Sequence, residues 1–228
     1  MTGQLLKATR KQRGLTQAET ALRLRVSQPY LALLERGKRT LGTKLARRAA
    51  RTLGLPATAV PPSSQVQRTS AETLTRKLSG LGYPGFAYVR SGWKNNPAEV
   101  LLAALATPDL ESRVTEALPW VLLKYPDLDT TWLVRQAKVL DLTNRLGFVV
   151  DLARQVAEKQ DGTESVRYQR LTQLENELSR SKLQAETTLC QESLSESERS
   201  WLREHRPEEA QRWNVLTNWK PEHLQFAY

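Results

Sequence analysis

The chain has 228 residues, with 34 Lys and Arg against 24 Asp and Glu, so its formal net charge is +10. Its single cysteine excludes a disulfide framework, and no apolar run approaches the roughly 18 residues that a membrane-spanning helix needs. The N-terminal segment MTGQLLKATRKQRG is basic but lacks the apolar core of a secretion signal, so we expect a cytoplasmic protein.

A capping box at Thr16 and Glu19 marks the start of one helix. In such a box the threonine hydroxyl accepts from the amide three residues later, and that residue's carboxylate accepts from the threonine amide. The spacing predicts a helix that begins at Gln17 and ends near Arg25. Its buried face should carry Ala18, Ala21 and Leu22.

A second helix is expected almost directly after the first. Ser27 is a suitable N-cap, Pro29 falls in the first turn, and Gly37 supplies the left-handed residue that ends the helix. Leu31 and Leu34 should face inward. The outer faces of this helix, about ten residues long, would then carry Gln28, Pro29, Ala32, Leu33 and Arg36. Such an outer face could enter the major groove of DNA.

The excess positive charge lies in the first quarter of the chain. Residues 1–60 hold 13 Lys and Arg against 2 Asp and Glu, whereas the other 168 residues hold 21 against 22. Basic side chains that neutralise phosphates release condensed counterions, so this segment should have salt-dependent affinity for DNA. Lys38 and Arg39 are the first candidates for phosphate contacts, and Arg10, Arg13, Lys44 and Arg47 are second choices. Arg47, Arg48 and Arg51 could equally solvate the outer face of a fourth helix.

This segment resembles the Cro/C1-type (XRE) helix-turn-helix family over about the first 56 residues. The matching residues are GLTQ at 14–17, VSQ at 26–28, Leu31 and ERGK at 35–38. The resemblance implies a five-helix, lambda-repressor-like domain in which the second helix of the pair reads bases. It therefore implies double-stranded operator DNA as the partner, and association with the nucleoid when the protein is bound.

The resemblance also implies roles for individual residues. Gln28 matches a base-reading position and would pair with an adenine or read a mixed edge, and Gln17 matches a position that holds a phosphate. Leu33 departs from the polar residue of some relatives, so it either meets a thymine methyl or packs. The full base-reading set is Gln28, Pro29, Ala32 and Leu33. The phosphate-binding set is Gln17, Ser27, Tyr30, Arg36, Lys38, Arg39 and Arg10.

Composition divides the chain where prolines and small polar residues replace helical periodicity, at residues 56–70. We expect a helix-turn-helix domain in residues 1–56, a linker in residues 57–70 and a mostly helical body in residues 71–228. The body would serve oligomerisation or partner binding. The predicted fold class is all-α, and the stretch 82–90 is expected to form a turn with at most one strand.

Prolines and caps mark the first body helices. Asn96, Pro97 and Glu99 combine into one helix-start signal, and TPD at 107–109 forms another. Two prolines, Pro119 and Pro126, should interrupt the helical pattern that follows. Asp129 or Thr130 should then cap residues 131–159, as one long helix or two abutting ones.

The remainder of the body is predicted to be helical and aromatic. Residues 163–188 form a charged amphipathic pattern whose Leu171, Leu174 and Leu178 would pack on the body itself or on a second copy. Ser195 and Glu198 form a second capping box. An aromatic tail ends in Phe226 and Tyr228. Most tryptophans should be core residues, and one or two could anchor a protein partner: Trp93, Trp120, Trp132, Trp201, Trp213 and Trp219.

No catalytic, metal-binding or cofactor-binding constellation is visible. His205 and His223 lack the neighbours of a base or a metal ligand and are expected to be solvated. A buried thiol is the expected state of Cys190, and Asp127 and Asp129 suit a turn and a helix cap. We therefore expect neither an enzyme nor a cofactor.

Three functions remain open. The first is a dimeric transcriptional repressor of its own operon, since one head alone buries too little surface for high specificity. The second is an antitoxin or immunity protein that masks a cognate toxin. Four runs resemble bodies of bacterial regulators paired with toxin genes: NPAE at 96–99, ALPW at 117–120, WLVRQAK at 132–138 and NRLG at 144–147. The third is a repressor that responds to a small effector bound in the aromatic core.

Overall fold

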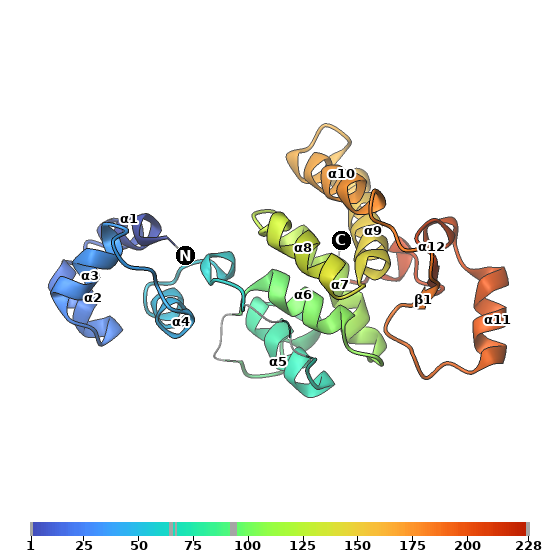
Figure 1. The fold of residues 1–228 in the computed structure, drawn as a ribbon, viewed down its shortest axis with the longest axis horizontal. Helices are drawn as coiled ribbons and strands as arrows, with labels where there is room; N and C mark the ends of the chain where they lie inside the picture. Colours follow the sequence, from blue (N-terminus) through green and yellow to red (C-terminus); the bar gives the residue numbers. More distant parts are fainter. Residues whose placement is uncertain (1, 64–65, 67, 92–94, 227–228) are drawn as a thin grey trace. The chain divides into compact units, whose positions relative to one another are not determined.

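The computed structural model describes residues 2–63, 66, 68–91 and 95–226. Two compact units are found, which we call the head (residues 1–64 and 92–96) and the body (residues 65–91 and 97–228). The all-α prediction is confirmed, since the described residues form twelve α-helices and a single sheet of two short strands (Figure 1). None of the described helices has the length and apolarity to cross a membrane.

The head consists of four α-helices and a final 3-10 turn. The helices are α1 (Gly3–Gln12), α2 (Gln17–Leu24), α3 (Gln28–Glu35) and α4 (Thr43–Thr52), and the turn is η1 (Ala57–Ala59). The resemblance implied a fifth helix, but the described residues of the head that follow α4 form this turn instead. Both predicted starts are confirmed, because Thr16 and Glu19 form the capping box of α2 and Ser27 caps α3.

Leucines of α1, α2 and α3, alanines of α4 and the segment after α4 form the core of the head. Leu31 and Leu34 of α3 are fully buried, as expected. The buried face of α2 differs from the prediction, because Thr20, Ala21 and Leu24 are buried while Ala18 is exposed and Leu22 is 80% exposed. Thr20 is tolerated inside because its hydroxyl donates to the carbonyl of Thr16 at 2.9 Å.

The predicted linker begins too early. Ala57, Ala59 and Val60 are buried, and Ala59 and Val60 belong to the hydrophobic core of the head. Asn96 was expected to act as a helix cap, but its side-chain Nδ2 donates to the Val60 carbonyl at 2.6 Å. Residues 57–60 are thus part of the head, because three of the four are small apolar residues buried there. Residues 64, 65 and 67 of the predicted linker lie outside the described residues.

The body is a bundle around one long helix, α9 (Thr143–Asp161), which packs against several of the others (Figure 1). The preceding elements are α5 (Ala71–Leu81), η2 (Pro84–Phe86), α6 (Pro97–Leu105), α7 (Ser112–Lys124) and α8 (Thr130–Val139). After α9 come α10 (Val166–Ser179), β1 (Thr187–Thr188), α11 (Glu196–His205), α12 (Glu208–Arg212), β2 (Val215–Leu216) and η3 (Pro221–His223). Strands β1 and β2 are parallel, with Thr187 opposite Val215.

Several expected boundaries in the body are confirmed. Asp129 caps α8 through the amide of Trp132, and the long apolar pattern resolves into two helices, α8 and α9. A capping box of Ser195 and Glu198 starts α11. Leu171, Leu174 and Leu178 of α10 are buried in the monomer, where α10 packs along α9. The seam is therefore filled by the body itself.

Other expectations for the body were wrong. Pro119 lies inside α7 and does not end it. The TPD motif starts no helix, because Thr107 donates back to Ala103 and Asp109 instead accepts from the amide and hydroxyl of Ser193. The predicted helix over 163–188 ends at Ser179, and the pairing of β1 with β2 was not foreseen. The turn expected over residues 82–90, by contrast, is confirmed, since this stretch contains the 3-10 turn η2 and no strand.

The tryptophans divide by burial. Trp120, Trp132 and Trp213 are core residues, whereas Trp201 on α11 is 51% exposed and stacks on His205. Trp93 and Tyr228 lie outside the described residues. Cys190 is fully buried as expected, and this burial raises the pKa of its thiol to about 12.

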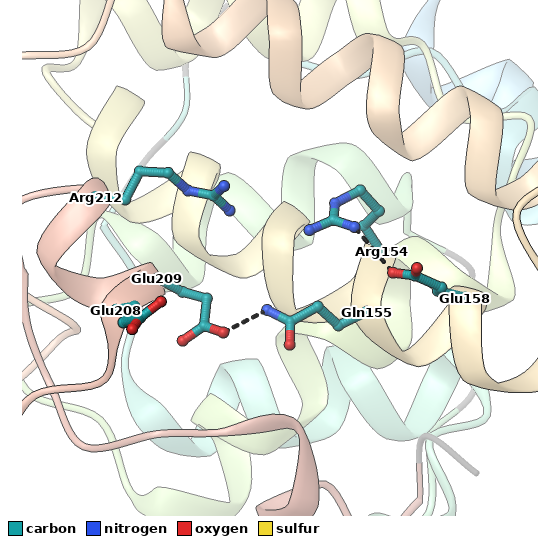
Figure 2. Close-up of a pocket in the computed structure, with 6 residues that line it drawn as sticks. All are labelled: Arg154, Gln155, Glu158, Glu208, Glu209 and Arg212. Atoms are coloured by element: carbon teal, nitrogen blue, oxygen red, sulfur yellow. Dashed lines mark hydrogen bonds and ion pairs between the residues drawn. The ribbon is translucent and has the colours of Figure 1, made fainter.

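A cluster of four charges joins three helices of the body. Asp151 of α9 is fully buried and pairs with Arg154 of the same helix and with Arg212 of α12. Glu175 of α10 pairs with the same two arginines, at 2.6 and 3.0 Å. Beside this cluster lies an open polar pocket of about 460 Å³ (Figure 2), lined by Arg154, Gln155, Glu158, Glu208, Glu209 and Arg212.

Candidate nucleic-acid interface

The helix-turn-helix is built from two capped helices and a short turn between them. Arg25 ends α2 in the left-handed region at φ 51°, and the Ser27 hydroxyl accepts from the amide of Tyr30 at 3.3 Å. Both ends of the turn are therefore fixed by local bonds. Because Leu31 and Leu34 anchor α3 in the core, the start of α3 projects outward.

The predicted base-reading residues lie on the outer side of α3. Gln28 and Pro29 are exposed, as is Tyr30 from the phosphate set, and Ala32 and Leu33 are half-buried. Leu33 is half-buried, so one part of its side chain packs against the head and another part is exposed for contact with a thymine methyl.

Glu35, at the end of α3, organises the inner side of this interface. Its carboxylate accepts from Arg10 Nε at 2.6 Å and Arg10 Nη2 at 3.0 Å, and from Gln17 Nε2 at 2.9 Å. These three side chains come from α3, α1 and the start of α2. The buried carboxylate therefore fixes all three helices relative to one another.

The contacts between Glu35 and Arg10 shift the pKa of both groups. Burial acts to raise the pKa of Glu35, but the hydrogen bonds from Arg10 and Gln17 and the charge of Arg10 outweigh it, so the pKa is lowered. The hydrogen bond to Glu35 raises the pKa of Arg10. Both groups are thus held in their charged forms.

Arg10 was wrongly assigned to phosphate contact. It is 8% exposed, and its guanidinium is committed to Glu35 and to the Leu15 carbonyl at 2.9 Å. A buried guanidinium with those bonds made cannot also reach a DNA backbone. Gln17 is partly exposed and uses one Nε2 hydrogen on Glu35, so its second hydrogen remains for a phosphate oxygen.

The basic residues that follow α3 are exposed to solvent. Arg36, Lys38 and Arg39 are all exposed, and Gly37 adopts φ 72°, the left-handed conformation that allows the chain to leave the helix there. Arg48 of α4 has a structural task, because its Nη1 donates to the Leu24 carbonyl at the end of α2, at 2.7 Å. Arg47 and Arg51 have interactions of their own.

Sequence reasoning missed Glu35 as the organising residue. Its partners Arg10 and Gln17 lie 25 and 18 residues away, so no local spacing rule connects them. A usable signal was present, however, because Glu19 and Glu35 are the two acidic residues among the first 60 and Glu19 is explained by its capping box.

Comparison with known proteins supports the same assignment. Residues 6–60 match the family model described as helix-turn-helix. The match supports a helix-turn-helix of the Cro/C1 (XRE) type in this segment, the type found in DNA-binding transcription regulators. Comparison with curated proteins and with solved structures found no match.

Proposed function

We propose that the protein is a sequence-specific transcription regulator that represses its own operon as a dimer. The observation that carries this proposal is the start of α3, where Gln28, Pro29 and Tyr30 are exposed on a helix fixed by Leu31, Leu34 and Glu35. An exposed helix start on a rigid base is what reading of a major groove requires.

In this proposal Gln28 reads a base edge, since a glutamine amide donates and accepts in the pattern that adenine presents. Pro29, Ala32 and Leu33 complete the reading face with apolar contacts. Lys38, Arg39 and Arg36 neutralise phosphates, and Gln17, Ser27 and Tyr30 add neutral hydrogen bonds to the backbone. The net charge of +11 over residues 1–60 supplies the attraction that is independent of sequence.

Dimerisation is part of the proposal because one head contacts a short half-site. Two heads bound about one helical turn of DNA apart would combine their affinities and read a palindrome. Because Leu171, Leu174 and Leu178 are buried in the monomer, the dimer would use another surface of the body.

A gel-shift titration of the full chain on its own upstream region, with random DNA as competitor, tests this function. Light scattering during size exclusion would give the mass of the protein alone. We expect a competitor-resistant complex formed by a dimer. Binding no stronger than that to random DNA would refute sequence-specific autoregulation, and a monomer with tight binding would refute only the dimer.

A further inference from the structure

A pocket of the body lies between α9 and α12 and carries charges of both signs (Figure 2). It measures about 460 Å³, which is within the range of pockets that hold small molecules. Arg154, Gln155 and Glu158 line it from α9, and Glu208, Glu209 and Arg212 line it from α12. Because all six of these side chains are polar, we expect the ligand of this pocket to be polar as well.

Arg212 is half-exposed and has free donors at this pocket. Its Nη2 donates to Asp151, which is fully buried, and is paired with Glu175 at 3.0 Å, so the guanidinium is held in place. Within the described residues, Arg212 Nε and Nη1 make no hydrogen bond. Arg154 differs, because its Nε, Nη1 and Nη2 all donate to carboxylates of the body. Arg212 is therefore the arginine that can bind an anionic group of a ligand.

Two glutamates of α12 have no ion pair within the described residues. Glu208 is exposed, and its side chain makes no hydrogen bond in this part of the chain either. Glu209 Oε1 accepts from Gln155 Nε2, a neutral donor, at 3.0 Å. Glu158 differs from both, because its Oε2 is paired with Arg154 at 3.2 Å. The carboxylates of Glu208 and Glu209 are therefore available for positively charged groups of a ligand.

Arg212, Glu208 and Glu209 together favour one combination of charges in a ligand. A simple anion would bind Arg212 but would be repelled by the two glutamates. A diamine would pair with both glutamates but would leave the free donors of Arg212 without an acceptor. A molecule with one carboxylate and two cationic groups matches all three side chains, and an α-amino acid with a basic side chain has these groups.

We propose that this pocket binds a free basic amino acid of the lysine type. The carboxylate of the ligand accepts from Arg212, and its two ammonium groups donate to Glu208 and Glu209. Asp151 and Glu175 are positioning residues, because they hold the guanidinium of Arg212. The site gives the body a small-molecule ligand of stated chemistry, and it does not depend on the DNA-binding proposal.

The test is calorimetric titration of the full chain with L-lysine and two matched probes. L-Norleucine lacks only the side-chain ammonium group of lysine, and cadaverine lacks only its carboxylate. We expect lysine to bind about three- to fivefold more tightly than either probe, since each partly exposed charge pair contributes modestly to affinity. Absence of saturable lysine binding at millimolar concentrations would overturn the proposal, as would equal binding of lysine and cadaverine.

Three variants assign the contacts. Arg212→Gln should remove the preference for lysine over cadaverine, with folding checked by circular dichroism because Asp151 loses a partner. Glu208→Gln changes an exposed side chain outside that ion-pair cluster and should weaken lysine binding about threefold or more. Glu164→Gln, at an exposed carboxylate outside the pocket, is the matched control and should leave binding unchanged. The proposal is overturned if Glu208→Gln does not affect lysine binding, or if a folded Arg212→Gln protein keeps the preference.

Discussion

Gly147 on α9 and Trp213 after α12 are in contact that leaves no room for a Cβ. An alanine methyl at position 147 would overlap the six-membered ring of Trp213, which is 1% exposed. The glycine thus allows a residue 66 positions later in the chain to close the body over its central helix. This contact explains an otherwise unfavourable glycine inside a long helix.

Gly147→Ala should therefore destabilise the body, although the same change in an open helix normally stabilises it. We expect a loss of about 1–3 kcal/mol from overpacking, measured by urea unfolding with tryptophan fluorescence. A Gly147→Ala protein as stable as the wild type would show that Trp213 is free to move away.

Loss of the Glu35 charge should destabilise the head. Glu35→Gln leaves the buried guanidinium of Arg10 without its ion pair, at a cost of about 3 kcal/mol. Arg10→Met with Glu35→Leu should cost less than Arg10→Met alone or Glu35→Gln alone, because no charge is then left buried. Unfolding of the three variants, followed by circular dichroism, would measure these costs, and a double variant less stable than both singles would contradict the argument.

The same ion pair predicts a pH dependence with a definite sign. The folded-state pKa of Glu35 is lowered, so its stabilisation is fully present above the unfolded-state pKa of about 4.3 and is lost as the pH falls through the folded value. Urea unfolding from pH 7 down to pH 2 should show the wild type losing more stability than Glu35→Gln. Parallel curves for the two proteins would exclude Glu35 as the titrating group.

Gln28→Ala should reduce discrimination between the operator and random DNA by about 1–3 kcal/mol. Fluorescence anisotropy with both DNAs at one salt concentration measures this. Gln169→Ala, an exposed glutamine on α10, is the matched control and should change neither affinity. Equal weakening on both DNAs would assign Gln28 to the phosphate backbone.

Lys38→Ala and Arg39→Ala should weaken binding to all DNA sequences alike. Each lost phosphate contact should reduce the slope of log affinity against log salt by about 0.9. Binding titrations at several salt concentrations would give the slopes, with the exposed Lys138→Ala of α8 as the control. A slope unchanged by both head substitutions would remove these residues from the interface.

The sequence by itself determined the features that depend on near neighbours. The capping boxes at Thr16 and Ser195, the cap at Ser27 and the left-handed Gly37 were predicted because each rests on contacts over three or four residues. The inward leucines of α3 follow from helical periodicity in the same way. These features were enough to indicate the helix-turn-helix and the start of its outward-facing helix.

Only the tertiary structure decided which side chains meet across the chain. Periodicity favoured Leu22 over Thr20 as a buried residue, but the packing of α2 against its neighbours buries Thr20 because its hydroxyl can bond to its own helix. Glu35 and Arg10 are brought together by the fold of three helices, and this pairing removes Arg10 from the DNA surface. Burial and partner choice depend on the whole packed arrangement, in which residues 25 or 66 positions apart become neighbours.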